Sequence, residues 1–163
     1  MIKRRTFVQG AMVSAGMSLL PASHAADMRT SLQKSDLVYI TALKSDGKES
    51  SCQSEIWYVW DGADIYVCTA TTAWRTRAAK KGLDRSRIWV GDVGNWQSSG
   101  GKYKDLPALE AATSVISDTN THQMALERFG SKYTMAWITY GPIFRKGLAD
   151  GSRSLIRYRP LTI

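Results

Sequence analysis

The sequence predicts one mainly antiparallel β domain with short helices, an α+β chain that closes as a small β-barrel. Segments rich in β-branched and aromatic residues alternate with turn sequences through the first half of the chain. No internal repeat or linker divides it. With 163 residues, 44% of them hydrophobic, the chain is long enough for one sizeable core and short for two domains.

The first three strands are expected to form a meander. Residues 37–43 are β-branched and aromatic, and they end at the turn sequence Ser45-Asp46-Gly47-Lys48. Residues 50–60 form the second strand, and residues 65–69 return after a hairpin turn at Asp61-Gly62.

Capping and turn residues indicate the elements that follow. Residues 73–81 are rich in alanine and basic residues and predict a helix, with Thr71 or Thr72 as its N-cap and Gly82 at its end. The remaining expected elements are a strand over 87–93, a loop over 94–105, helices over 106–116 and 121–129 (the second ended by Gly130), and a strand over 155–160 that Pro160 stops.

The chain begins with the three parts of an export signal. These are the basic Lys3-Arg4-Arg5, a weakly apolar stretch over 11–20, and the small residues Ser23 and Ala25 at positions −3 and −1 of a cleavage site after residue 25. Two arginines followed by Thr6-Phe7-Val8 are typical of a twin-arginine signal. The alternative is an ordinary secretory signal that contains two arginines. We expect a leader over 1–25 and a single domain over 26–163.

If the signal is of the twin-arginine type, it predicts a partner, a location and a bound group. The chain would be recognised by the twin-arginine export machinery and would be periplasmic or otherwise exported. That route carries folded proteins, often because a cofactor is inserted first. An exported protein of this size is therefore expected to bind something before it leaves.

Composition excludes several classes of protein. The sequence has no apolar run of about 20 residues, so it predicts no permanent membrane span. It also has no cluster of histidine and cysteine residues with zinc-ligand spacing. The formal charge of +8 suits an anionic ligand. Nucleic-acid binding also fits the charge but conflicts with export, so we expect none; the residues concerned are Arg75, Arg77, Lys80, Lys81, Arg85 and Arg87.

Catalytic side chains are not evident in the sequence. His122 lies on a predicted polar helix and is expected to be solvated, Ser51 and Ser54 lack a nucleophile elbow, and Asp61 and Asp64 belong to a turn. No catalytic residue is therefore assigned. The protein is either a binding module or uses a cofactor for its chemistry.

The most informative stretch is residues 67–81, where a strand end carrying hydroxyls leads into a basic helix. A helix start with one or two arginines suits a phosphate group. A capped, solvated basic helix with Trp74 in the core is the alternative. Arg75 and Arg77 are two residues apart, so they do not share a helical face.

A resemblance to a known family covers roughly residues 37–160. It rests on Tyr39-Ile40-Thr41-Ala42-Leu43, Ile56-Trp57-Tyr58-Val59-Trp60-Asp61-Gly62, Ile65-Tyr66-Val67-Cys68-Thr69, Trp74-Arg75-Thr76-Arg77 and the closing Leu155-Ile156-Arg157-Tyr158-Arg159-Pro160. This succession resembles the pyridoxamine 5′-phosphate oxidase-like, FMN-binding split-barrel superfamily.

The resemblance implies a six-stranded antiparallel split β-barrel that forms a homodimer, with FMN in each groove between the subunits. By position, the flavin phosphate would lie near Cys68, Thr69, Trp74 and Arg75, with Arg77 compensating for Trp74, where the oxidases have a cation. The second strand would run beside the flavin ring and ribityl chain through Gln53, Ser54, Glu55, Ile56, Trp57 and Tyr58.

Two functions remain open. The first is an exported FMN-dependent oxidoreductase acting on an unidentified small molecule. The second is a non-catalytic binding protein for flavin, deazaflavin or haem. Vitamin B6 oxidation is not expected, because the oxidases carry a late segment with tryptophan and arginine residues, whereas the last tryptophan here is Trp137.

The hairpin register predicts that the two cysteines stay free. A turn at Asp61-Gly62 places Cys68 opposite a residue between Glu55 and Trp57, so Cys52 is displaced by at least about three residues, or about 10 Å. A disulfide requires Cα atoms within about 7 Å.

Overall fold

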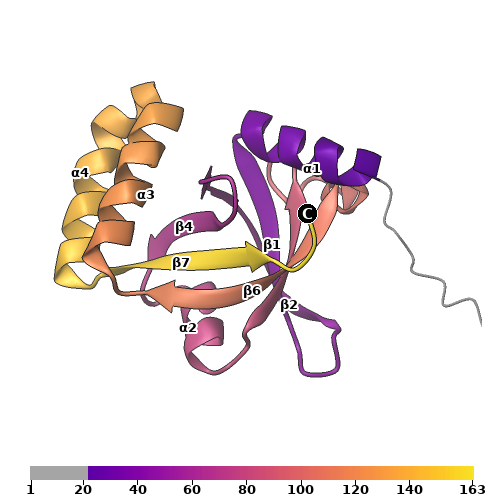
Figure 1. Cartoon of the computed structure of the whole chain (residues 1–163). Helices are drawn as coiled ribbons and strands as arrows, with labels where there is room; N and C mark the ends of the chain where they lie inside the picture. The colour runs from indigo at the N-terminus through magenta and orange to yellow at the C-terminus, as the bar shows by residue number, and fades with distance from the viewer. Residues whose placement is uncertain (1–21) are drawn as a thin grey trace, which may run out of the picture.

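A computed structural model describes residues 22–163. The predicted leader, residues 1–25, therefore lies outside the described residues except at its end. Within the described part, one antiparallel sheet in the order β2-β1-β5-β6-β7-β4-β3 curls into a half-barrel (Figure 1). The strands are β1 (Leu37–Leu43), β2 (Glu49–Trp57), β3 (Val59–Trp60), β4 (Ile65–Ala70), β5 (Arg85–Val90), β6 (Ala108–Ile116) and β7 (Arg153–Pro160).

Helices lie at three places around the sheet, with the short α2 at the bottom of the view (Figure 1). One helix, α1, runs beside the open end where the C-terminus lies, while α3 and α4 form a hairpin at the opposite side. The helices are α1 (Ala22–Lys34), α2 (Trp74–Lys80), α3 (Thr119–Lys132) and α4 (Thr134–Asp150), with a 3₁₀ turn, η1 (Lys102–Asp105).

The sheet curls because β2 and β3 are consecutive in the chain but lie at opposite edges of the sheet. β2 pairs with β1, β3 pairs with β4, and only Tyr58 separates them. The predicted strand over 50–60 is thus two strands, and the sheet has seven strands instead of six. The Tyr58 side chain is fully buried, and its hydroxyl donates to the carbonyl oxygen of Leu32 at 2.8 Å.

Local turn chemistry confirms the predicted turn at Asp61-Gly62 and the end of the short helix. The predicted three-strand meander is wrong, because only β3 pairs with β4 across this turn, while β2 pairs with β1 at the other edge of the sheet. Trp60 pairs with Ile65 across the Asp61-Gly62 turn, and Gly82 follows α2 with a φ of 86°. The predicted threonine cap of that helix is wrong. The N-cap is Ala73 without a side-chain hydrogen bond, because the Thr71 hydroxyl instead donates to the carbonyl oxygen of Gly151.

The predicted helix over 106–116 is also wrong, because these residues form β6. Its alanine, leucine and glutamate residues favour a helix intrinsically. In the fold, β6 pairs with β5 on one side and with β7 on the other. Leu109 and Ala111 are buried and alternate with more exposed residues, as in a strand with one face on the core.

The second predicted helix, over 121–129, is confirmed but does not end at Gly130. α3 continues to Lys132, and α4, which the sequence did not predict, follows at once. A Cβ on Gly130 would lie 2.8 Å from the Trp137 indole nitrogen, and one on Gly141 would lie 2.9 Å from it. These glycines therefore let Trp137 pack closely between α3 and α4.

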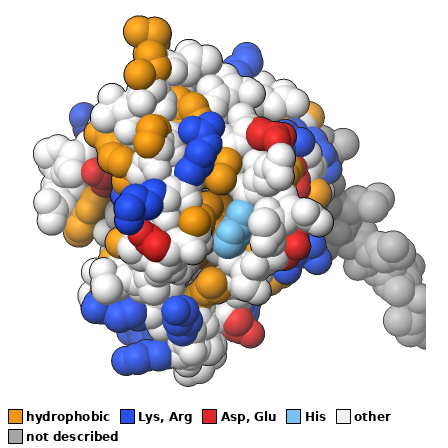
Figure 2. All heavy atoms as spheres, turned by 90° about the vertical axis from the view of Figure 1, so that its left-hand side faces the viewer, with side chains coloured by type: hydrophobic (Ala, Val, Ile, Leu, Met, Phe, Trp, Pro, Cys, Tyr) orange, Lys and Arg blue, Asp and Glu red, His pale blue; other side chains and the backbone are white. Residues whose placement is uncertain are grey.

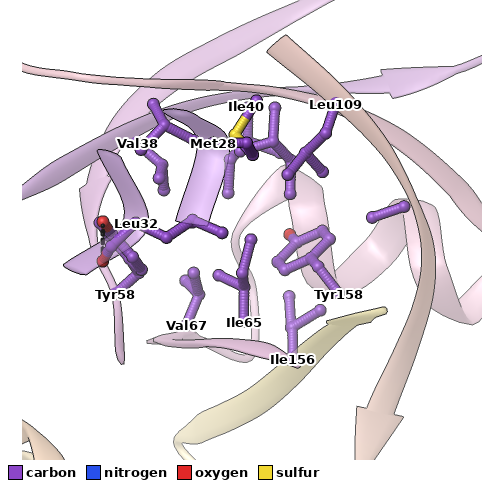
Figure 3. Close-up of a cluster of buried hydrophobic side chains, with 13 residues drawn as sticks. Met28, Leu32, Val38, Ile40, Tyr58, Ile65, Val67, Leu109, Ile156 and Tyr158 are labelled. Carbon is purple, nitrogen blue, oxygen red and sulfur yellow. Dashed lines mark hydrogen bonds between the residues drawn. The ribbon is translucent and has the colours of Figure 1, made fainter. Parts of the chain in front are cut away.

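Two hydrophobic clusters lie on opposite faces of the sheet. The interior of the barrel holds Met28, Leu32, Ile65, Ile156 and Tyr158 among others (Figure 3). The second cluster joins the outer face of the sheet to the helical hairpin through residues such as Cys68, Phe129, Phe144 and Leu155. Both cysteines are free, Cys52 exposed and Cys68 buried. None of the helices in residues 22–163 is long and apolar enough to cross a membrane.

Candidate functional site

Arg75 is the centre of the candidate site. It lies in the first turn of α2, and its Nε donates to the Thr69 hydroxyl on β4 at 3.2 Å. Its Nη1 donates to the Ser54 hydroxyl on β2. Strands from different parts of the sheet therefore hold one guanidinium, and the fold brings together three of the residues that the sequence indicated.

The Arg75 guanidinium is half-buried and has no carboxylate within ion-pair distance in residues 22–163. Burial lowers its pKa, while Tyr158 and Glu55 act in the opposite direction. A guanidinium has five N–H donors, and the two hydroxyls occupy only two of them. The site is thus a fixed cation with free donors, which suits an anion such as phosphate.

The neighbours of Arg75 on α2 have different roles. Trp74 packs against the barrel core, and its ring centroid lies 5.5 Å from the Arg75 guanidinium carbon, within cation–π distance. Arg77 is exposed and does not share the Arg75 contacts. Trp74 therefore supports Arg75 and adds no second cation.

Gln53 and Glu55 contact the loop after β5. The Tyr103 hydroxyl donates to Gln53 Oε1, and the Glu55 carboxylate accepts from the Asn95 side chain at 2.9 Å and the Trp96 backbone at 3.3 Å. The sequence did not indicate these loop partners, since hydrogen bonds to residues about 40 to 50 positions away leave no local signal.

Helices cover the remaining predicted positions. Trp57 stacks on Tyr133 with ring centroids 4.5 Å apart, and Cys68 lies beneath α3 and α4. Burial raises the pKa of the Cys68 thiol to about 11, so the thiol stays protonated at neutral pH. Ile56 and Tyr58 belong to the barrel core. Of the predicted positions, Ser54, Thr69 and Arg75 are therefore the ones whose side chains contact one another.

A half-buried lysine lies outside the positions that the sequence indicated. Lys132 Nζ lies 3.5 Å from the centroid of the Tyr58 ring and donates to the Tyr58 carbonyl oxygen at 3.1 Å. Burial lowers its pKa to about 8, while Asp36 acts in the opposite direction. No sequence signal identifies such a lysine, because its environment depends on the packing of α3 against the sheet.

The other basic residues in the sheet are mostly neutralised. Arg87 pairs with Glu49 and Glu110, and Arg85 also pairs with Glu110. In the described residues no group of three or more histidine, cysteine or acidic side chains is placed to hold a metal ion. His122, on α3, has its Nε2 within 2.8 Å of the Ile116 carbonyl oxygen.

No family model matches the sequence, and no curated protein matches it. Solved structures match its fold. HutZ, the haem storage protein of Vibrio cholerae, is 14% identical with a TM-score of 0.58, over 85% of this chain and 90% of that chain. A conserved hypothetical protein of Mycobacterium tuberculosis is 13% identical with a TM-score of 0.59, over 91% and 86%.

A third match is a Clostridium acetobutylicum protein related to general stress protein 26, of the pyridoxinephosphate oxidase family. It is 12% identical with a TM-score of 0.55, over 86% of each chain. At these identities the likeness concerns the fold, and it agrees with the curled antiparallel sheet described above. The chain therefore has the split-barrel fold of the pyridoxamine 5′-phosphate oxidase-like proteins.

Proposed function

We propose that this protein binds FMN through its phosphate and serves as an exported flavin-dependent oxidoreductase on a small molecule. The observation that carries the proposal is the Arg75 guanidinium, which two hydroxyls orient and which no carboxylate pairs in residues 22–163. A half-buried cation without an ion-pair partner gains most from an anionic ligand.

Each residue of the site has a role toward the phosphate. Arg75 supplies charge-assisted hydrogen bonds, while Ser54 and Thr69 restrict its rotamers before the ligand arrives. Trp74 lies within cation–π distance of the guanidinium. When bound, a flavin would supply the electron or hydride transfer. A homodimer, with the flavin between subunits, and export by the twin-arginine route are parts of the same proposal.

The first test is a binding titration with a matched pair of ligands and a matched pair of variants. Replacing Arg75 by alanine is expected to weaken FMN binding by about 1.5–3 kcal/mol, or roughly 10- to 150-fold. Riboflavin lacks the phosphate, so its affinity should stay unchanged. Arg77→Ala, which removes an exposed arginine from the same helix, should leave both affinities near those of the original chain.

The outcome against the proposal is equally clear. An equal loss of FMN and riboflavin affinity in Arg75→Ala would mean that Arg75 acts through folding. A full-length protein that is colourless as purified, and that takes up no added FMN, would remove the flavin from the proposal. If the proposal holds, the purified protein should show flavin absorption bands at about 370 and 450 nm.

A binding protein without catalysis is the second candidate, and one observation favours it. Around Arg75 the contacting side chains are hydroxyls and an indole, none of which is a general acid or base at neutral pH. The same cationic site would accept the phosphate of a deazaflavin or a haem propionate. Titration with all three ligands, followed by a test for turnover of the bound flavin with a reductant and oxygen, separates storage from catalysis.

A further inference from the structure

A cavity lies between α3 and α4, and it shares no residue with the Arg75 site. Its volume is about 560 Å³, which is within the range of small-molecule sites. Figure 2 looks onto this side of the molecule, where hydrophobic and charged side chains are interspersed. The lining residues used below are His122, Gln123, Leu126 and Glu127 from α3, and Arg145 and Leu148 from α4.

Two opposite charges line this cavity without pairing to each other. Glu127 comes from α3 and Arg145 from α4, and no ion pair within 4.0 Å joins them. The Glu127 carboxylate accepts a hydrogen bond from the Gln123 amide at 3.1 Å. The Arg145 guanidinium lies 5.5 Å from the centroid of the Trp137 ring. Within the described chain, neither has a partner of opposite charge.

The rest of the lining supplies an apolar surface and one further polar group. Leu126 and Leu148 are half-buried and face the cavity from the two helices. His122 is held by the hydrogen bond between its Nε2 and the Ile116 carbonyl oxygen. Since a carbonyl oxygen only accepts, Nε2 is the donor in this contact.

From this arrangement we propose that the cavity binds a small zwitterion with an apolar body, of the amino-acid or dipeptide class. Its carboxylate meets Arg145, its ammonium group meets Glu127, and its apolar side chains lie on Leu126 and Leu148. Both charged residues are exposed, so water screens each contact and the affinity is modest. The inference is independent of flavin binding, because it uses other residues on other elements, α3 and α4.

The test is an NMR titration of the full chain with three related probes. L-Leucyl-L-leucine carries both charges, its N-acetyl form lacks the ammonium, and its amide form lacks the carboxylate. The free dipeptide should shift amide signals of α3 and α4 selectively and bind more tightly than either capped form. Arg145→Gln and Glu127→Gln should each weaken it by about two- to fivefold. Lys146→Gln, next to Arg145 on α4, is the matched control and should have no effect.

Other results would overturn the inference. Equal binding of the capped and free dipeptides would exclude recognition of a zwitterion. Free-dipeptide binding that Arg145→Gln and Glu127→Gln leave unchanged would exclude this cavity, as would the absence of selective shifts in α3 and α4. Thermal unfolding of each variant checks that a loss of dipeptide binding is not caused by a loss of the folded structure.

Discussion

At the scale of single residues, Lys132 makes a prediction about pH. Its pKa is about 8 in the folded chain and ordinary, near 10.4, in the unfolded chain. Between these values the unfolded chain binds more protons, so this group raises the free energy of unfolding as the pH rises from about 8 toward 10. Its contact with the Tyr58 ring favours the charged form and reduces the effect.

Replacing Lys132 by methionine should remove that pH dependence. In urea unfolding, the stability of the original chain relative to Lys132→Met should increase by about 1–2 kcal/mol between pH 7 and pH 9.5. Lys80→Met, at an exposed position of α2, should follow the original chain at both pH values. A difference that stays constant with pH would contradict the lowered pKa.

The residue scale also shows how far the candidate site was predictable. Arg75 and Thr69 are adjacent to one strand–helix junction, so the sequence indicated both. Ser54 was indicated only as one position in a run of six. The alternation of strand side chains decides which of these meet Arg75, since Ser54 and Glu55 contact different partners. That assignment depends on how the sheet curls, which no local pattern encodes.

At the scale of elements, Tyr133 anchors the α3–α4 hairpin to the sheet. Its hydroxyl accepts from the Tyr58 backbone N–H at 3.0 Å and lies 2.8 Å from the carbonyl oxygens of Asp36 and Tyr58. Replacing Tyr133 by phenylalanine leaves the buried Tyr58 N–H without its partner, which should cost about 1–3 kcal/mol of unfolding free energy. Chemical denaturation measures this loss.

Tyr140 provides the control for that substitution. It also contacts Trp57, edge-on at 5.2 Å, but it is 44% exposed, so water can satisfy its hydroxyl. Tyr140→Phe should therefore leave the unfolding free energy within about 0.5 kcal/mol of the original value. A loss in Tyr133→Phe no larger than that in Tyr140→Phe would contradict the role of the Tyr133 hydroxyl in holding the hairpin.

Element prediction from the sequence succeeded where local signals and tertiary contacts agree. β1 and the Asp61-Gly62 hairpin have strong strand and turn residues, and both are confirmed. β6 contradicts its own helix propensity because it is paired on both sides. α4 contains Pro142, Gly141 and Gly147, residues that normally interrupt a helix. Its packing against α3 and β7 outweighs them.

At the scale of the whole molecule, the barrel is completed by a segment close to the predicted leader. α1 begins at Ala22, so cleavage after Ala25 would fall within it and leave residues 26–34 on the mature chain. Met28 and Leu32, at 6% and 1% exposure, belong to the barrel core. The Leu32 carbonyl oxygen also accepts from the buried Tyr58 hydroxyl, next to the point where the chain changes edges of the sheet.

This arrangement predicts where the stable domain begins. A chain starting at Ala26 retains both core side chains and should unfold with the same free energy as the full chain. A chain starting at Asp36 loses them, at about 1.5–3 kcal/mol each, and leaves the Tyr58 hydroxyl without its acceptor. It should lose at least about 4 kcal/mol in urea unfolding. If the chain from Ala26 were equally destabilised, the domain would begin before residue 26, and cleavage after Ala25 would not fit this fold.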